Sequence, residues 1–558
     1  MKPVSRYLAL LATTCVAFYC ARAQTENAER TQIPSGPYRI AGTIVNAKTG
    51  NPLPIARVTI ADSKNRQSMQ SLITNEGGHF DFHVPAGKYS LEAAKRGFVT
   101  ASYNQHDQFS TAIVAGPDQE TENLVLRLAP NAVLAGKVLD EVGDPVRHAQ
   151  VMVYREDHSQ GVSRISRFRG ASTDDQGRYE VAQLDEGTYF VSAKATPWYA
   201  VHPTSSGEAA RQPSQVDPSL DVAYPITYYG DATEADDATP IPVRGGDRLE
   251  ADIHLNPLPA LHLIVHAPEN SAHGITLPTL QKSAFDGVEQ VPTGGIQSVG
   301  PGVYELTGIA PGRYTVRMPD PDGHSKESAE VDINSGGELD LSSGSVTSKI
   351  KAMVKIEGAA HLPAQLLIEL RNSDLRNRDL RNSKSSASAV AVDAKGEANF
   401  SDIIPGKYDV VANSQTQRYS VVRIASEAGS ISGHALNVPP GASLTVSLSL
   451  VGGSVTVEGF AKRAGKAVSG AMIVLVPKNP EANRDRLRRD ESDSDGSFTL
   501  QGVIPGSYTV VAIENGWDLD WAQPAVLAAY LKRGQTLELG DRSPTTLHLP
   551  SAVEVQTK

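Results

Sequence analysis

Cysteine is nearly absent from this sequence of 558 residues, which contains only Cys15 and Cys20. Both lie in an N-terminal stretch with the features of an export signal, so residues 24–558 contain no cysteine. This absence excludes disulfide bonds, thiolate nucleophiles, iron–sulfur clusters and cysteine-ligated zinc from that part of the chain. Each folded part must therefore depend on a hydrophobic core, which segments of about 100 residues are large enough to form.

Long hydrophobic runs are also missing outside the first 23 residues. There, Lys2 and Arg6 precede an apolar run from Leu8 to Tyr19, and Ala21-Arg-Ala23 offers the small residues of a cleavage site. The run is shorter than the ~20 residues that cross a bilayer. We expect a cleaved signal peptide at 1–23, with an uncleaved membrane anchor as the alternative, and therefore a secreted, periplasmic or cell-surface protein.

Clustered positive charge is scarce. Loss of the three basic residues of the signal lowers the formal net charge from −11 to −14. The one arginine-dense stretch, Arg484–Arg489, is flanked by acidic residues, and we expect it to be a solvated loop. An acidic chain of this kind argues against nucleic acid as a partner.

Catalytic motifs are missing as well. The sequence has neither the Gly-x-Ser-x-Gly elbow of a serine hydrolase nor the His-Glu-x-x-His motif of a zinc hydrolase. His262 and His266 on one strand would lie ~13 Å apart, too far to share a metal. Glu491-x-Asp493-x-Asp495-Gly496 resembles the start of a calcium loop, but the twelfth position, counted from Glu491, is Gly502 rather than an acid. We expect a structural turn there, with calcium as the alternative, and no enzyme, cofactor or catalytic residue.

What the sequence does contain is a short motif that recurs five times and ends in Gly-x-Tyr. The intervals between its tyrosines are 100, 125, 94 and 100 residues, which match the size of a β-sandwich domain rather than a solenoid repeat. The pairs are Gly87 and Tyr89, Gly187 and Tyr189, Gly312 and Tyr314, Gly406 and Tyr408, and Gly506 and Tyr508.

Short predicted strands with alternating apolar and polar residues, separated by turn signals, surround each motif, as in an all-β sandwich. In Thr173-Asp-Asp-Gln-Gly-Arg-Tyr179, glycine suits a positive φ, and the aromatic two residues later points into the core. We expect the tyrosine of the motif to begin the next strand, with its ring buried and its hydroxyl available for a hydrogen-bond partner. In the fourth copy Ala398 replaces the aromatic, and Phe400 lies on the same face, so we expect the same fold with a repacked core.

These observations predict an all-β protein of about five tandem β-sandwiches. The predicted segments are the signal peptide 1–23, an N-terminal linker 24–36, and sandwiches at 37–130, 131–258 with a long loop at 196–246, 259–347, 348–450 and 451–558.

The order Gly-x-Val, Gly-x-Pro-(apolar)-x-x-Ala-x-Val, Thr-Asp-x-x-Gly-x-Phe and Pro-Gly-x-Tyr resembles the carboxypeptidase regulatory-like domain family. The resemblance extends over residues 39–99, 133–195 and 454–513, and partly over 298–318 and 391–412. It implies the transthyretin-like (prealbumin-like) seven-stranded β-sandwich and a non-catalytic accessory or structural module, here in tandem in a secreted bacterial protein.

Three stretches depart from the repeated pattern. Residues 370–384 repeat a five-residue unit, predicting an expanded loop or a short helix. Residues 514–533 predict one or two helical turns. The stretches 196–246 and 514–533 contain aromatic residues outside the repeat, including Tyr224. The candidate binding residues among them are Trp198, Tyr199, Tyr228, Tyr229, Trp517 and Trp521.

Exposed aromatic rings are typical of sugar-binding platforms, because a flat ring covers the apolar C–H face of a sugar. The alternative is that these rings hold long loops in place or pack one domain against another. The sequence thus favours a non-catalytic scaffold or adhesion protein. The alternatives are a carbohydrate-binding protein and an accessory protein that docks a secreted hydrolase or receptor. The partner is unknown, with a polysaccharide or another envelope protein as candidates.

Overall fold

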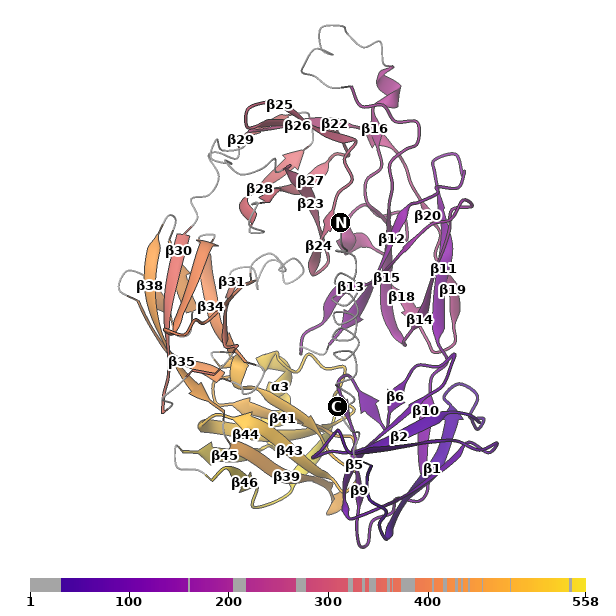
Figure 1. Ribbon diagram of the computed structural model, residues 1–558, viewed down its shortest axis with the longest axis vertical. Coiled ribbons are helices and arrows are strands. Elements are labelled where there is room, and N and C mark those ends of the chain that lie inside the picture. The colour runs from indigo at the N-terminus through magenta and orange to yellow at the C-terminus, as the bar shows by residue number, and fades with distance from the viewer. Residues whose placement is uncertain are drawn as a thin grey trace, which may run out of the picture. The chain divides into compact units, whose positions relative to one another are not determined.

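The computed structural model describes residues 32–558 with internal gaps (Figure 1). The gaps are 159–160, 204–216, 267–276, 320–324, 334–336, 341–347, 359–361, 364, 373–386, 404–405, 415–418, 427–429, 433–434, 440–441, 454, 482 and 541–543. The predicted signal peptide and most of the five-residue tandem therefore lie outside the described residues. We use first to fifth repeat for the five predicted sandwich segments.

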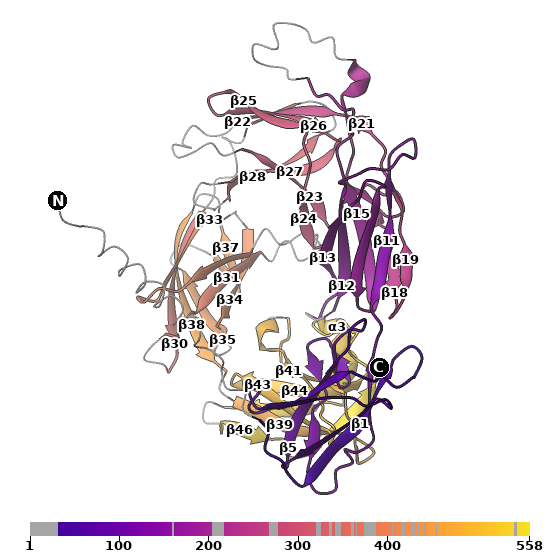
Figure 2. The same cartoon turned by 45° about the vertical axis from the view of Figure 1, so that its right-hand side comes forward.

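The chain is an all-β protein made of paired sheets in tandem, as predicted (Figures 1 and 2). Contacts between Cα atoms divide it into two compact units. One is the first repeat up to Leu128, except Gly97–Val99 and His106–Phe109. The other contains those two short segments and Ala129–Lys558.

In every repeat the opening strand lies between an antiparallel neighbour and a parallel one, the latter formed by the closing part of the repeat. The strands of these sheets are β1 (Tyr38–Asn46), β4 (His79–Val84) and β10 (Leu124–Leu128); β11 (Ala132–Leu139), β14 (Arg178–Leu184), β19 (Arg248–Glu250) and β20 (Ile253–His254); β22 (Leu261–His266), β25 (Gly295–Gly300), β26 (Val303–Ile309) and β29 (Gly337–Asp340); β30 (Ser348–Ile356), β33 (Glu397–Ile403), β35 (Tyr419–Ser426) and β38 (Ser443–Gly452); β39 (Val455–Arg463), β40 (Lys466–Ala467), β43 (Ser497–Val503), β46 (Thr546–His548) and β47 (Val553–Thr557).

The second sheet of every repeat is antiparallel at its centre. Its strands are β2 (Arg57–Asp62), β3 (Met69–Ile73), β5 (Gly87–Ala94), β6 (Ala101–Ser102) and β9 (Ile113–Ala115); β12 (Gln150–Asp157), β13 (Arg164–Ser172), β15 (Gly187–Lys194), β17 (Thr227–Tyr228) and β18 (Ile241–Val243); β23 (Thr279–Ala284), β24 (Gly287–Gln290), β27 (Gly312–Pro319) and β28 (Ser325–Ile333); β31 (Leu367–Asn372), β32 (Ala387–Ala391), β34 (Gly406–Asn413), β36 (Ser430–Ser432) and β37 (Ala435–Val438); β41 (Met472–Pro477), β42 (Arg488–Glu491), β44 (Gly506–Glu514) and β45 (Gln535–Leu539). In the fifth repeat β47 pairs with both β39 and β44, so its two sheets are joined.

A few short elements lie outside these sheets. The predicted helical turns of the last stretch are confirmed as α3 (Pro524–Leu531). The others are β7 (Gln105–His106) and β8 (Phe109–Ser110), β16 (Val222–Ala223) and β21 (Leu258–Pro259), and the 3-10 turns η2 (Pro218–Leu220), η3 (Ala235–Asp237) and η4 (Arg484–Arg486).

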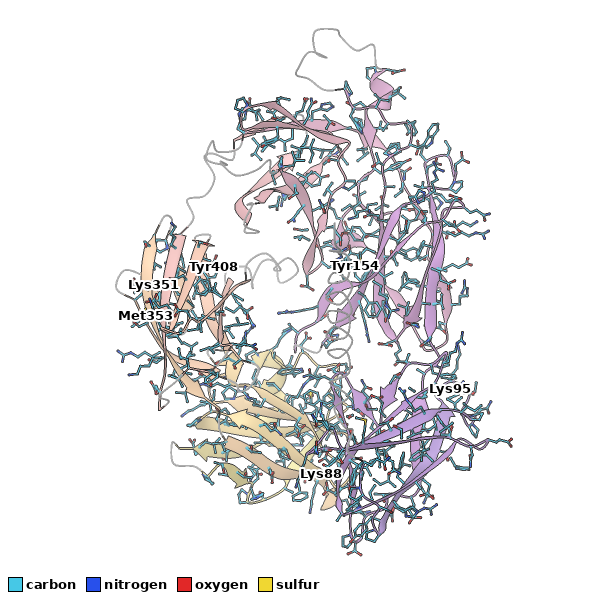
Figure 3. All side chains as sticks on the ribbon, in the orientation of Figure 1. Lys88, Lys95, Tyr154, Lys351, Met353 and Tyr408 are labelled. Atoms are coloured by element: carbon cyan, nitrogen blue, oxygen red, sulfur yellow. The ribbon has the colours of Figure 1, made fainter. Side chains whose placement is uncertain are left out.

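Strict alternation of apolar and polar residues explains why the strands form sandwiches. In β30 every second side chain from Ser348 is buried, and Lys351 and Met353 lie on the exposed face (Figure 3). The fourth repeat has the predicted repacked core, with both Ala398 and Phe400 buried. By contrast, all six residues of β41 are buried, because an apolar layer covers each face of that strand.

The second and third repeats do not have fully separate cores. Tyr154, Phe190 and Tyr228 of the second repeat pack in one cluster with the core residues of the third, including Phe285 and Tyr314. This differs from the expectation that each repeat holds itself with its own core. The long loop of the second repeat returns through β17 and adds apolar side chains such as Tyr228 to this cluster, where they join Tyr154 of β12 and Phe190 of β15.

Candidate functional site

The recurring tyrosines have the predicted structural role. Each of the five rings is buried. Among the described residues, the hydroxyl in four repeats donates to the backbone carbonyl oxygen four residues earlier. The spacing of the tyrosines along the sequence does not predict this bond. The pairs are Tyr89 with Pro85 (3.1 Å), Tyr189 with Asp185 (2.9 Å), Tyr314 with Ala310 (2.6 Å) and Tyr508 with Ile504 (2.7 Å). Burial raises the pKa of each of these four phenols above its ordinary value.

A hydroxyl clamp accounts for a residue whose role the sequence did not reveal, the Thr or Ser before the Asp/Asn-x-x-Gly turn. In the second repeat Thr173 Oγ1 accepts from the N–H of Ala149 (2.8 Å) and donates to the carbonyl oxygen of Val146 (2.7 Å). The first and fifth repeats have the same geometry, with Thr74 between Ala56 and Leu53 and Ser492 between Ala471 and Val468. One feature of the sequence could have indicated this clamp. In these three repeats the apolar residue that supplies the carbonyl oxygen lies three positions before the Ala that supplies the N–H.

The turn that follows is held by its acid or amide side chain. Asn75, Asp174 and Asp393 each accept hydrogen bonds from the backbone N–H groups two and four residues later. In the fifth repeat the N–H of Ser497 donates to Asp495 Oδ1 (2.9 Å), and Gly496 has φ +80°. These bonds favour the structural interpretation of the turn, and calcium binding there stays a prediction without a test.

Arg484–Arg489 is not the solvated loop that we expected. It forms η4 and the start of β42, and Arg488 is buried because its guanidinium donates to the carbonyl oxygens of Gly502 and Asp485. Arg489 lies over the rings of Trp517 (5.2 Å) and Trp521 (4.8 Å). Buried carbonyl oxygens compensate the charge of Arg488, and aromatic faces compensate that of Arg489. The acidic residues around this stretch in the sequence did not indicate such burial.

The six candidate aromatics fall into three groups, of which the first is Tyr228 and Tyr229. Tyr228 has no exposed surface and contacts Tyr154 and Phe285 edge-on or tilted (Figure 3 labels Tyr154). Tyr229 is partly buried against the core of the second repeat. The ring of Tyr228 therefore offers no face to a ligand and instead packs one repeat against the next.

The second group is Trp517 and Trp521. Trp517 is only 9% exposed and donates its Nε1–H to the carbonyl oxygen of Gly470 (3.1 Å). It belongs to an apolar cluster on the outer face of β41 and β44, which Leu527 of α3 also covers. Within the second unit, the ring of His106 stacks on Trp517 at 4.9 Å. These contacts fit the alternative interpretation, in which the loop rings pack parts of the chain together.

Trp198 and Tyr199, the third group, differ from the others. Trp198 is 88% exposed, and its ring is nearly perpendicular to that of Tyr199, with centroids 5.7 Å apart. The hydroxyl of Tyr199 donates to Glu141, and the hydroxyl of Tyr224 donates to the other oxygen of the same carboxylate (2.7 Å).

The electrostatics of this trio are consistent with a fixed geometry. Burial acts to raise the pKa of Glu141, but hydrogen bonds from the Tyr199 hydroxyl, from the backbone N–H of Glu141 and from the Tyr224 hydroxyl together outweigh it and hold that pKa below its usual range. Burial, and then the Glu141 carboxylate, raises the pKa of Tyr199 to about 12. A neutral phenol therefore holds the segment next to Trp198 against an ionised carboxylate at neutral pH.

The histidines of β22 have separate partners, in agreement with the distance expected between them. His262 Nε2 lies 2.9 Å from Asp221 Oδ2, whereas His266 pairs with Glu338. In the described part of the chain, no group of three or more His, Cys, Asp or Glu side chains is arranged to hold a metal ion. Among the described residues, no helix is long and apolar enough to span a membrane.

Comparison with known proteins supports the resemblance for the first repeat. Residues 39–128 match the model of the carboxypeptidase regulatory-like domain. None of the curated proteins matches the chain.

Several solved structures are similar at low identity. The TIE protein of Bacillus anthracis is 12% identical, with 77% of this chain and 76% of that chain covered and a TM-score of 0.17. The minor pilin GBS52 of Streptococcus agalactiae is 14% identical, with 40% and 97% covered and a TM-score of 0.22. Two B repeat units of the collagen-binding protein of Staphylococcus aureus are 10% identical, with 74% and 100% covered and a TM-score of 0.12.

Proposed function

We propose that the protein is a non-catalytic scaffold or adhesion protein, exported from the cell, whose repeats resist tension. The observation that carries this proposal is the parallel pairing of the opening and closing strands of each repeat. In the fourth repeat it joins eight consecutive residue pairs, from Lys349 with Ser443 to Ile356 with Leu450.

Parallel pairing determines how a stretched repeat breaks. When two parallel neighbours are the first and last strands, their outer ends point in opposite directions along the sheet. Tension on the chain then pulls the strands past each other and loads all the ladder hydrogen bonds together, since parallel bonds are evenly spaced. An antiparallel terminal pair would instead open one bond at a time. The recurring polar side chains support the same function, because the Thr/Ser clamps, turn acids and tyrosines bond to backbone within their own repeat.

Single-molecule force spectroscopy tests this proposal. The chain from residue 24 has no cysteine, so cysteines introduced at chosen positions are unique attachment points. Pulling on the chain ends should give discrete unfolding events, with the fourth repeat among the strongest. The matched control pulls the same repeat through Lys349→Cys and Ser443→Cys, which are paired neighbours, so that the ladder opens bond by bond at a much lower force. Equal forces in the two directions would contradict the proposal.

A second candidate function is carbohydrate binding by Trp198 and Tyr199, favoured by the one highly exposed indole among the described residues. The segment around it is fixed by the bond from Tyr199 to Glu141, and a preorganised ring loses little entropy on binding. Exposed apolar side chains of Val142 and Val201 accompany it in the same repeat.

A glycan array and an insoluble-polysaccharide pull-down test this candidate. Trp198→Ala should abolish binding and leave unfolding unchanged. The matched control is Phe460→Ala, which removes another exposed ring, on β39, and should leave binding unchanged. If no glycan binds, the carbohydrate-binding candidate is refuted and the scaffold function stands alone. Protein partners, including the secreted hydrolase or receptor considered above, should then be tested.

A further inference from the structure

The edge strand of the first repeat, β3, has neither a charged residue nor a proline. It reads Met69-Gln-Ser-Leu-Ile73, the sheet ends at it, and its pairing with β2 has no register shift. Charges, prolines and bulges are the usual devices that keep an exposed edge from pairing with another chain. The corresponding strand of the fifth repeat, β42, consists of four charged residues, and β13 of the second repeat has three arginines and a register shift. The strand β3 lacks these protections.

Two hydrogen bonds at the ends of β3 determine which of its backbone groups face the open edge. The N–H of Asp62 donates to the carbonyl oxygen of Ser68 (3.0 Å). The N–H of Thr74 donates to the carbonyl oxygen of Ala56 (2.9 Å). Since hydrogen-bonded pairs alternate along an antiparallel ladder, the even-numbered residues of β3 also bond toward β2. The residues whose N–H and C=O groups point to the open edge are Met69, Ser71 and Ile73.

Apolar side chains are exposed at the C-terminal end of this strand. Ile73 is 58% exposed, and Ile55, whose N–H donates to the carbonyl oxygen of Thr74 (3.1 Å), is 73% exposed. Ile55 also has φ +54°, a conformation that is costly for a β-branched residue. Backbone strain of this kind is concentrated at ligand clamps and other functional sites. A strand added along β3 would cover the side chain of Ile73.

We propose that β3 pairs antiparallel with β3 of a second copy of this chain, about a two-fold axis at Ser71. In this register Ser71 lies opposite its own copy, and Met69 lies opposite Ile73 of the second copy. No other antiparallel register places all three outward-facing residues of each strand in hydrogen-bonded pairs. The side chains of Met69 and Ile73 then meet on one face of the joined sheet. The inference goes beyond the proposed scaffold function and does not depend on it.

Charge complementarity favours a second copy as the occupant. The same register brings Arg66 of one copy toward Glu76 of the other, and the two-fold axis repeats this pair. Both side chains are exposed. The first repeat, residues 37–130, has nine basic and eight acidic residues, whereas the chain from residue 24 has a formal net charge of −14. Two acidic chains can therefore meet at this repeat with little repulsion.

Cysteine cross-linking tests the register in the chain from residue 24, which contains no cysteine. The Cα atoms of directly opposite, hydrogen-bonded residues lie about 5.5 Å apart, within the range of a disulfide. Ser71→Cys should therefore give a disulfide-linked dimer when copper phenanthroline and air oxidise the two thiols. Ser166→Cys changes an exposed serine on the edge strand β13, so it is the matched control and should stay monomeric.

Sedimentation equilibrium tests the occupant. A pairing of five residues buries less than the ~800 Å² per partner of a standard interface, so we expect a dissociation constant of about 0.1 mM. Arg66→Glu should weaken the dimer about tenfold, because two attractive pairs become repulsive. The double variant Arg66→Glu, Glu76→Lys should restore it. Ser71→Lys should abolish the dimer, since like charges then lie directly opposite each other.

Thermal unfolding is the control for these exposed substitutions and should be unchanged. A chain that stays monomeric at about 0.3 mM would overturn the second copy as the occupant of the edge. Equal dimer yields from Ser71→Cys and Ser166→Cys would overturn the register. A dimer that survives Ser71→Lys would also overturn the proposal, because it must form through another surface.

Discussion

The N–H of Ala149 donates to the hydroxyl of Thr173, 2.8 Å away in the interior of the second repeat. The same hydroxyl donates to the carbonyl oxygen of Val146. His148, immediately before Ala149, has φ +58°, so this stretch leaves the regular ladder and its backbone groups need another partner. In the fourth repeat Val392, which has no hydroxyl, occupies the position that Thr173 has in the second. Its backbone N–H nevertheless donates to the carbonyl oxygen of Leu366 (2.8 Å).

Thr173→Val should therefore destabilise the second repeat. The substitution keeps the shape of the side chain but leaves a buried N–H and a buried carbonyl without their partner, at a cost of about 1–3 kcal/mol. The measurement is hydrogen exchange at the amide of Ala149, whose protection should fall. Thr173→Ser is the control, because Ser492 makes the same two bonds in the fifth repeat. Equal protection in the Val and Ser variants would refute the clamp.

Glu289→Ala should weaken the junction between the second and third repeats. Glu289 is buried and accepts from Tyr154 (3.0 Å) and Lys194 (3.3 Å), and it also pairs with Arg167. Removing it leaves the mostly buried Lys194 without its carboxylate, which typically costs about 3–5 kcal/mol. Urea unfolding should then separate these repeats into an earlier transition. Glu180→Ala, which breaks an exposed pair with Arg248, is the control and should change stability by less than about 0.5 kcal/mol.

Trp517→Ala and Trp198→Ala should have opposite signatures. Loss of the buried Trp517 ring opens a cavity between β41, β44 and α3 and should destabilise the fifth repeat by about 3–5 kcal/mol. Loss of the exposed Trp198 ring should leave stability unchanged but remove most of the iodide quenching of tryptophan fluorescence, since Trp517 is buried and Trp521 is partly buried. Iodide quenching that is undiminished in Trp198→Ala would contradict the high exposure of that ring.

The repeated sandwich was predictable because its signals are local. Gly at a positive φ, an aromatic two residues later and a tyrosine after the next turn are each explained within about 15 residues. The pairing of the first strand with the last, in contrast, joins residues about 90 apart, such as Lys349 and Ser443, and no turn specifies its direction.

The candidate site was only partly predictable. Trp198, Tyr228 and Trp517 all lie in stretches without apolar periodicity, so no local pattern distinguishes an exposed ring from a buried one. Their burial depends on where each loop returns: Tyr228 returns onto Phe285 of the next repeat, and Trp517 returns onto the outer face of β41. Contacts between parts of the chain that are distant in sequence set both outcomes.

The last prediction concerns alkaline pH. Burial, and then the neighbouring Tyr228 and Glu289, raises the pKa of Tyr154 far above its ordinary value. An unfolded tyrosine ionises near pH ~10, so the contribution of neutral Tyr154 to stability is complete below that pH and is lost as pH rises above it. The free energy of unfolding should therefore fall above about pH 10, and the absorbance of tyrosinate should rise together with unfolding. Tyr154→Phe should lower stability at neutral pH, because its bond to Glu289 is lost, yet reduce the alkaline decline. Tyr530→Phe, a partly buried phenol on α3, is the control and should leave that slope unchanged. Ionisation of Tyr154 in the folded protein would contradict the burial that joins the second and third repeats.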